Sequence, residues 1–213
     1  PIGAFFGGIS AGFPVIMVLK NLIPIIIIAA LISVGLWKFE NGMIKGFTVF
    51  GKFIVAVITV GLICGIVESL TGITIIKGMN PISEGFETVA DICIVLAGAF
   101  PLVTVITRVF RKPLMKLGHI MGMNDVAAAG MIASLANSIP MFQMLKDMDK
   151  RGKIINIAFA VSAAFVFGDH LGFTAGFDSK MIVPMIIAKL ISGICAALLA
   201  IVISNKALPK ETE

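Results

Sequence analysis

Five apolar runs of about 20 residues or more dominate the sequence and restrict the folds that it can adopt. They cover about residues 13–37, 44–67, 85–110, 154–177 and 181–204. A helix of roughly 20 apolar residues, rising about 1.5 Å per residue, crosses the ~30 Å hydrocarbon core of a bilayer. None of the runs alternates between polar and apolar residues, as a strand of a membrane barrel would. The sequence therefore predicts an all-α fold, a polytopic transmembrane helical bundle.

Composition supports this class and excludes others. Hydrophobic residues make up 58% of the chain and charged residues 14%, whereas soluble domains are about 45–50% apolar and about 25% charged. A cytosolic enzyme, a coiled coil and a disordered chain are therefore excluded. The net charge is +5, but the basic residues lie between the apolar runs, which indicates a membrane surface and no nucleic acid partner. Cys64, Cys93 and Cys195 each lie inside an apolar run, so we expect buried thiols and no disulfide framework.

The domain prediction is a single transmembrane domain over residues 1–213. The chain begins at Pro1, directly in apolar sequence, without the charged start of a signal peptide. We interpret it as the C-terminal part of a longer transporter, whose remaining N-terminal part would be its first partner.

The placement of positive charge predicts that residues 124–145 do not simply cross the membrane. Residues 108–123 and 146–153 each carry four lysines or arginines, and a crossing would put these two clusters on opposite sides, against the positive-inside tendency. If the segment instead enters and leaves on one side, twelve cations share that side and only Lys77 and Lys180 lie opposite. The twelve are the two clusters of four with Lys38, Lys45, Lys206 and Lys210. We therefore expect a re-entrant or broken helix, centred on residues 137–140.

Polar residues of this segment are the first candidate site. Pro140 lacks a backbone N–H and leaves the carbonyl of Ala136 without its helical partner. Asn137, Ser138 and Gln143 add side-chain donors and acceptors nearby. A kinked helix whose polar groups bond to neighbouring helices is the simpler interpretation. Together with the charge pattern, the residues predict a substrate-lining break, as in transporters built from discontinuous helices.

A second set of candidates consists of ionisable residues near or inside apolar runs. Asp169 and His170 follow a 15-residue uncharged stretch, and ionisable groups at such depth are costly and usually functional. Glycines recur every four residues at 168, 172 and 176, which lets a ligand or helix approach closely. The simpler interpretation is a structural pair at a helix end. Asp91, one turn inside the run at 85–110, is a further candidate for substrate binding.

Motifs for other chemistry are absent from the sequence. It contains no phosphate loop, dinucleotide fingerprint or zinc-protease motif, so we expect no cofactor, no metal and no enzyme. Two alternatives to a transporter stay open at this point. One is an intramembrane aspartyl-type hydrolase that uses Asp91 with Asp169 as a dyad. The other is a non-transporting structural membrane subunit.

Three longer segments carry a family resemblance. They are MNDVAAAGMIASLANSIPMF (Met123–Phe142), DKRGKIINIAFAVSAAF (Asp149–Phe165) and GDHLGF (Gly168–Phe173). The chain resembles the EutH family, the ethanolamine permeases of bacterial ethanolamine-utilisation operons. The resemblance implies a multi-pass carrier in the bacterial inner (cytoplasmic) membrane, feeding ethanolamine to a lyase that yields acetaldehyde and ammonia. It implies no site residues, so these rest on the physical argument above.

The candidate residues suit such a substrate. Ethanolamine is mostly a small ammonium ion near neutral pH and carries one hydroxyl, so it needs a carboxylate or carbonyl cage and an amide or hydroxyl partner. We expect a secondary carrier or facilitator with alternating access around the broken segment. The sequence leaves open whether protons, sodium or no ion is coupled to transport, and whether the protein is a homo-oligomer.

Overall fold

The computed structural model describes residues 1–109 and 111–207. Over these residues the chain forms ten α-helices and two short 3-10 helices, with no strand. Three helical stretches, residues 15–38, 40–71 and 179–206, are long and apolar enough to cross a membrane. The all-α class is confirmed. Phe110, at the end of one predicted run, and Lys210, one of the twelve cations, lie outside the described residues.

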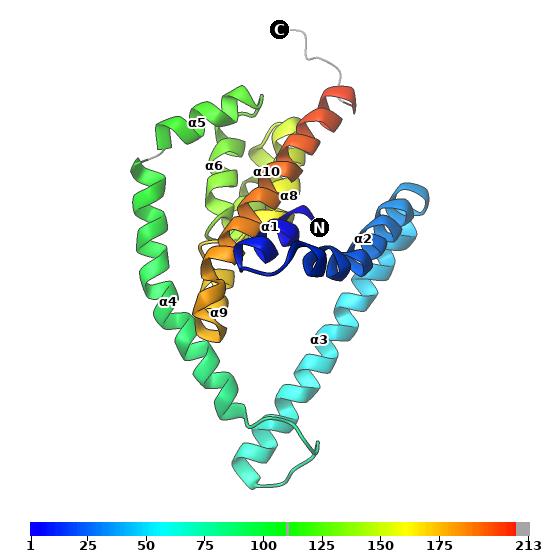
Figure 1. Cartoon of the computed structure of the whole chain (residues 1–213), viewed down its shortest axis with the longest axis vertical. Helices are drawn as coiled ribbons and strands as arrows, with labels where there is room; N and C mark the ends of the chain where they lie inside the picture. Colours follow the sequence, from blue (N-terminus) through cyan, green and yellow to red (C-terminus); the bar gives the residue numbers. More distant parts are fainter. Residues whose placement is uncertain (110, 208–213) are drawn as a thin grey trace. The chain divides into compact units, whose positions relative to one another are not determined.

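The helices follow one another with short connections. In chain order they are α1 (Ile2–Ser10), α2 (Val15–Lys38), α3 (Glu40–Thr71), α4 (Ile82–Val109), α5 (Arg111–Ile120), α6 (Asp125–Ser134), α7 (Ser138–Met144), η1 (Leu145–Asp147), α8 (Lys150–Ala163), α9 (Asp169–Phe177), η2 (Ser179–Met181) and α10 (Ile182–Ala207). Figure 1 shows them coloured along the chain. The predicted basic loop 108–123 therefore contains a helix, α5, in which an apolar side of Leu117 and Ile120 accompanies Lys112 and Lys116.

The chain divides into two compact units, residues 21–90 and residues 1–20 together with those from 91 onward. In the first unit, most apolar side chains of α2 and α3 are exposed, as expected for helices that face lipid. Gly72, with φ of +74°, ends α3 in the left-handed conformation that glycine adopts freely. The hydroxyl of Thr74 then donates a 2.7 Å hydrogen bond to Glu68, which fixes the loop that follows.

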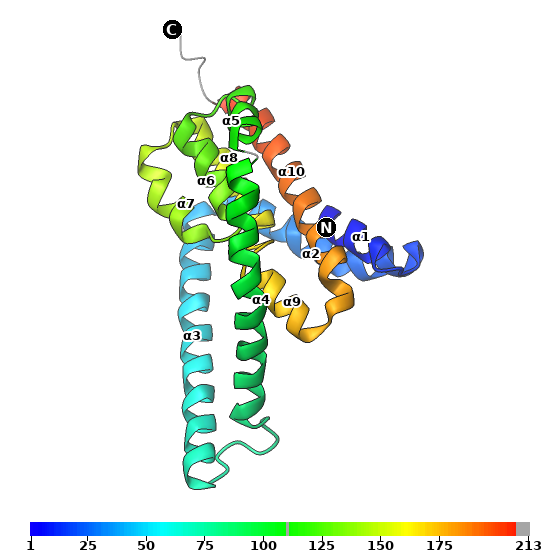
Figure 2. The same ribbon diagram turned by 90° about the vertical axis from the view of Figure 1, so that its left-hand side faces the viewer.

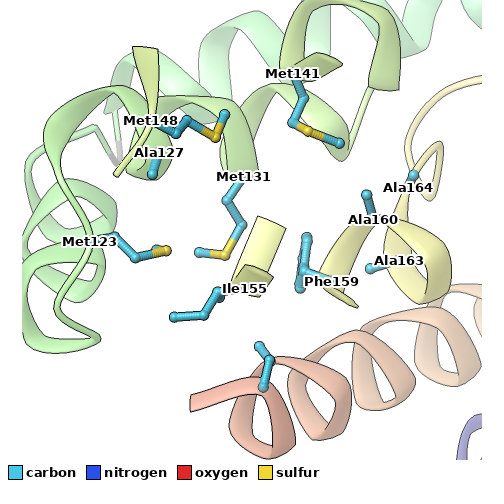
Figure 3. Packing of buried hydrophobic residues seen from close by; sticks show 12 residues of the cluster. Met123, Ala127, Met131, Met141, Met148, Ile155, Phe159, Ala160, Ala163 and Ala164 are labelled. Carbon is cyan, nitrogen blue, oxygen red and sulfur yellow. The ribbon is translucent and has the colours of Figure 1, made fainter. Parts of the chain in front are cut away.

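The second unit contains the core. Figure 3 shows methionine side chains from α6, α7 and their flanking loops converging on Ile155 and Phe159 of α8. Met141 and Ile155 are fully buried. Methionine suits this position because its flexible side chain fills irregular gaps between short helices. The core therefore holds α6, α7 and α8 together as one packed layer.

Helices α8 and α10 pack against each other in antiparallel orientation (Figure 1). At one end, the guanidinium of Arg151 donates hydrogen bonds to Asn205 and to the carbonyl of Met121. Further along, a Cβ at Gly193 would lie 2.4 Å from the Cβ of Ala163. This separation is below any van der Waals contact, so glycine is what allows the two helices to meet there.

Residues 124–148 form a helical hairpin, with α6 and α7 side by side (Figure 2). The backbone N–H of Asn124 donates to Asp149 at 2.9 Å, and its side-chain amide donates to the carbonyl of Asp147 at 3.1 Å. The entry and exit of the hairpin therefore meet. Helix α6 has 10 residues, about 15 Å of rise, which is half of a bilayer core. The segment is therefore a broken, closed hairpin, and the prediction that it is not one continuous helix is confirmed.

The helix breaks differ from the prediction in two respects. The first break covers residues 135–137 and precedes the predicted centre, so Pro140 lies in the first turn of α7. An N–H at that position has no intrahelical partner in any helix, so proline is tolerated there and does not create the break. The predicted continuous run 154–177 is wrong, because it is divided into α8 and α9 by a turn at residues 164–168.

Candidate functional site

The two helix breaks lie against each other and are joined by backbone hydrogen bonds. The N–H of Phe165 donates to the carbonyl of Ser134 at 3.0 Å, and the N–H of Phe167 donates to the carbonyl of Leu135 at 2.9 Å. Each break thus supplies the partners that a continuous helix would have supplied internally. We call residues 134–138 and 164–170 the junction. Irregular backbone at membrane depth is stable only when such partners or a water-filled cavity cover it.

The junction is tightly packed at its centre. A Cβ at Gly168 would lie 2.0 Å from the carbonyl oxygen of Ala136, so the two backbones touch. Phe165 has φ of +61°, a left-handed conformation that is uncommon for a bulky residue. Strained backbone of this kind persists only where surrounding contacts hold it, and it is concentrated at functional sites.

Asn137 and Ser138 lie where α7 begins. The side-chain oxygen of Asn137 accepts a 2.8 Å hydrogen bond from the N–H of Ile139 and so caps the helix. Among the described residues, the amide nitrogen of Asn137 makes no hydrogen bond, and it stays free to donate to a ligand. Ser138 is buried. Both predicted residues therefore lie at the junction. Asn137 has a structural role there as the cap of α7.

Asp169 and His170 lie where α9 begins, directly after Gly168. Both are exposed on the surface of this chain, and Asp169 has no ion-pair partner among the described residues. The imidazole of His170 lies beside Phe165, with ring centroids 5.5 Å apart. Because Gly168 touches Ala136, these two residues and the pair Asn137–Ser138 flank one point of contact.

The electrostatics of the junction combine opposite helix ends, because α6 and α8 end there while α7 and α9 begin there with partial positive charge, and Asp169 adds the full charge. The carbonyl end of a helix carries partial negative charge. Asp169 adds a full negative charge and is itself stabilised by its position in the first turn of α9. A small ammonium ion at this point would meet a carboxylate, helix carbonyl ends and the amide of Asn137.

Two predicted site residues lie away from the junction. Asp91 packs against Gly176, where a Cβ would be 3.1 Å from the Cβ of the aspartate. Gly172, between them and the junction, packs against Ile92 in the same way, so the glycine face of α9 is covered by α4 (Figure 2). Gln143 is exposed near the end of α7, six residues beyond Asn137.

The sequence argument missed one ionisable residue near the junction, Lys189. It lies two turns inside the apolar helix α10 and is half-buried, four residues before the contact of Gly193 with Ala163 at the end of α8. A lysine inside an apolar run is not by itself evidence of a site, because its long flexible side chain can extend the ammonium to the membrane surface. The signal that could have identified it is a lone charge within the apolar stretch 181–204.

Cavities and metal ligands do not point to another site. An open groove of about 490 Å³ lies between α1, α9 and α10, and Asp178 is the one charged residue of its lining. That carboxylate already accepts a 3.0 Å hydrogen bond from the N–H of Lys180, as a helix cap. Among the residues that the structure describes, no three His, Cys, Asp or Glu side chains are placed to hold a metal ion.

Comparison with known proteins identifies the family. A family model described as "Ethanolamine utilisation protein, EutH" matches residues 1–203. The chain belongs to the EutH family. This match includes every helix that forms the junction of this EutH-family chain.

Curated relatives agree with the family match. The chain is 63% identical over 210 residues to "Probable ethanolamine permease EutH" of Listeria monocytogenes and 46% identical over 234 residues to the protein of the same name from Escherichia coli. Each alignment covers 99% of this chain and 56% of the relative. The chain thus spans about half the length of these relatives. It is also 48% identical over 197 residues to "Uncharacterized protein YxeR" of Bacillus subtilis, covering 92% of this chain and 53% of that protein. No solved structure matches the chain.

Proposed function

We propose that this chain forms part of a transporter for ethanolamine, of the secondary carrier or facilitator type. The observation that carries the proposal is the junction, where two broken helices meet and where Asp169 and Asn137 each directly follow one of the two residues in contact, Gly168 and Ala136. The ammonium group of the substrate binds Asp169 and the carbonyl ends of α6 and α8, and its hydroxyl accepts from Asn137. A charge-assisted bond and a neutral bond together distinguish an amino alcohol from a simple amine.

The relatives support this assignment by name, since two of those compared are called probable ethanolamine permeases. We propose that the protein lies in the bacterial inner membrane and crosses it several times, which its three long apolar helical stretches support. The proposed transporter also includes a part that corresponds to the residues of the longer relatives that this chain does not cover.

The proposed mechanism is alternating access around the junction. Helices α7 and α9 are short, at 7 and 9 residues, and each is anchored at the junction by its first turn. Because Met141 holds α7 in the packed layer with α6 and α8, α9 is the half-helix that can move as a unit while this layer stays fixed. A substrate bound between them would then be exposed first to one side of the membrane and afterwards to the other.

The hydrolase alternative gains no support from the geometry. An aspartyl dyad requires carboxylates about 3 Å apart that share a proton. Asp91 packs beside Gly176, seven residues from Asp169, which is roughly 10 Å along α9. The two carboxylates therefore lie in different environments and do not form such a dyad. Transport is the better-supported function.

Uptake of labelled ethanolamine by proteoliposomes tests the proposal. The purified protein is assayed beside its Listeria relative, with and without an imposed pH gradient. Saturable uptake above protein-free liposomes is expected, and an increase with the gradient would identify protons as the coupling ion. Uptake by the relative but not by this protein would contradict the proposal for this chain.

A further inference from the structure

Helix α5 is too short to cross a membrane and is rich in positive charge. Its sequence, RKPLMKLGHI, contains three lysines or arginines and one histidine but no acidic residue. Its 10 residues rise about 15 Å, half of the hydrocarbon core of a bilayer. The helix begins at Arg111, two residues after α4 ends at Val109. It therefore begins where the predicted apolar run 85–110 ends.

Contacts with α6 fix which side of α5 faces the protein. Gly118 is buried, and a Cβ there would lie 2.4 Å from the Cβ of Ala128. The imidazole Nε2 of His119 lies 2.9 Å from the carboxylate Oδ1 of Asp125. The backbone N–H of Met123 donates to the carbonyl of Gly118 at 3.1 Å and closes the turn between the helices. These contacts set the rotation of α5 about its own axis.

Two further sides of α5 are exposed, and they differ in chemistry. Lys112 and Lys116 are four residues apart, so they share one side, and both are exposed. Leu117 and Ile120 are three residues apart and share the next side, where they are 47% and 73% exposed. Successive residues of a helix are separated by about 100°. The lysine side and the apolar side are therefore distinct neighbouring surfaces.

This arrangement differs from that of the spanning helices. In α2, the four consecutive residues Ile25–Ile28 are all exposed, so apolar side chains cover the whole circumference of the helix, as lipid on every side requires. In α5, charge and apolar surface are separated. A helix with lysines on one side and leucine or isoleucine on another lies in the plane of the membrane interface, with its apolar side in the acyl region.

We propose that α5 is an interfacial helix that binds anionic phospholipid, with Leu117 and Ile120 among the acyl chains and Lys112 and Lys116 on the headgroup phosphates. Charge complementarity identifies the lipid, because α5 has no carboxylate and a lysine near an anionic membrane surface is strongly attracted to it. The carboxylate of Asp125, on α6, is engaged by His119. The inference goes beyond the proposed function and does not depend on which substrate is carried.

The lipid contact has a consequence for the hairpin of α6 and α7. The hairpin begins directly after α5, and the contacts of Gly118 and His119 tie α5 to α6. A ligand that binds only the folded protein stabilises it in proportion to its affinity and concentration. Anionic lipid on α5 should therefore stabilise the start of the hairpin and hold it at the membrane surface.

Thermal unfolding in detergent with added lipid tests the charge side. The wild type should unfold at a higher temperature with dioleoylphosphatidylglycerol than with dioleoylphosphatidylcholine. The phosphatidylglycerol concentration that gives half of this shift should rise roughly fivefold for each of Lys112→Gln and Lys116→Gln. Lys112→Arg with Lys116→Arg, which keeps both charges, should respond like the wild type. Lys77→Gln with Lys180→Gln, which removes two exposed lysines outside α5, is the matched control and should also respond like the wild type.

Two results of this experiment would overturn the inference. One is an unchanged phosphatidylglycerol response in Lys112→Gln with Lys116→Gln. The other is an equal shift from sn-glycerol 3-phosphate, which has the phosphate but no acyl chains and would indicate a site for a soluble anion. Neither result depends on uptake of ethanolamine, so both are separate from the test of the proposed function.

Fluorescence quenching tests the apolar side. Trp37 is the one tryptophan of the chain, so in a Trp37→Phe background a new tryptophan reports from a single position. In bilayers of phosphatidylglycerol and a phosphatidylcholine brominated in mid-chain, Leu117→Trp and Ile120→Trp should be strongly quenched. Lys116→Trp, on the neighbouring side, is the matched control and should be quenched much less. Weak quenching at 117 and 120 would mean that water or another protein segment covers this side, and it would overturn the inference. Equally strong quenching at 116 would do so as well, because the helix would then be immersed in lipid.

Discussion

The carbonyl oxygen of Ala136 lies so close to the α-carbon of Gly168 that a Cβ at position 168 would be 2.0 Å away. These two residues belong to different helix breaks, 32 positions apart in the chain. Their contact fixes the distance between the start of α7 and the start of α9, and with it the positions of Asn137 and Asp169. The candidate site therefore depends on a contact that only glycine permits.

Gly168→Ala should separate the two breaks and destabilise the protein by about 1–3 kcal/mol, the usual cost of overpacking. Uptake should fall with it, because the two half-helices lose their relative position. The measurement is thermal unfolding in detergent together with proteoliposome uptake. Gly46→Ala in α3, where a Cβ meets nothing within 4 Å, is the control and should be neutral or slightly stabilising. Equal melting temperatures for the two variants would contradict the packing described here.

Asn137→Leu should raise the apparent KM for ethanolamine or abolish uptake, because it removes the amide that is free to donate. It also removes the cap of α7, at a cost of about 1 kcal/mol. Asn137→Ser retains a capping oxygen and so separates the two effects. It should keep the stability of the protein while still weakening the binding of the substrate. Pro140→Ala is the nearby control and should be close to the wild type, because proline at that position replaces an N–H that has no helical partner. Normal uptake by Asn137→Leu would mean that the residue only caps α7.

Asp169→Asn should raise KM by roughly 10- to 100-fold, since a hydrogen bond to a charged group contributes about 1.5–3 kcal/mol. The shape of the side chain and one acceptor are kept, so membrane insertion should not change. Asp169→Glu should retain partial uptake, because the charge persists in a shifted position. Asp178→Asn removes a carboxylate outside the junction but keeps a capping oxygen, and it should transport normally. Wild-type kinetics in Asp169→Asn would move the cation site elsewhere, with Asp91 as the next candidate.

The closed hairpin of α6 and α7 predicts membrane topology. In a variant without the native cysteines, Lys116→Cys and Lys150→Cys should both react with an impermeant thiol reagent only from the cytoplasmic face. Lys77→Cys should react only from outside. The reason is that the hydrogen bonds of Asn124 hold the two ends of the hairpin together. Labelling of positions 116 and 150 from opposite faces would show that residues 124–145 cross the membrane.

The helical class and most spans follow from the sequence because hydropathy is a local property. The runs predicted at 13–37, 44–67 and 181–204 correspond to α2, α3 and α10 within a few residues at each end, apart from a longer α3. Charge spacing along the chain also predicted that residues 124–145 do not form one continuous helix, and the break at residues 135–137 confirms this. Hydropathy and charge spacing can both be obtained from the sequence without knowing which residues are in contact. The same local signals, polar groups where apolar sequence was expected, selected four candidate site residues: Asn137, Ser138, Asp169 and His170.

The tertiary structure decided where the helices break and which candidates meet. Nothing in the stretch AAFVFG (163–168) forces an interruption, since it contains neither proline nor a charged residue. The turn exists because the N–H groups of Phe165 and Phe167 find carbonyls of residues 134 and 135 in another segment. Long-range hydrogen bonds of this kind leave no periodic signal in a sequence. For the same reason, the sequence did not show that Asp91, equally conspicuous in the sequence, packs against Gly176, two turns along α9 from Asp169.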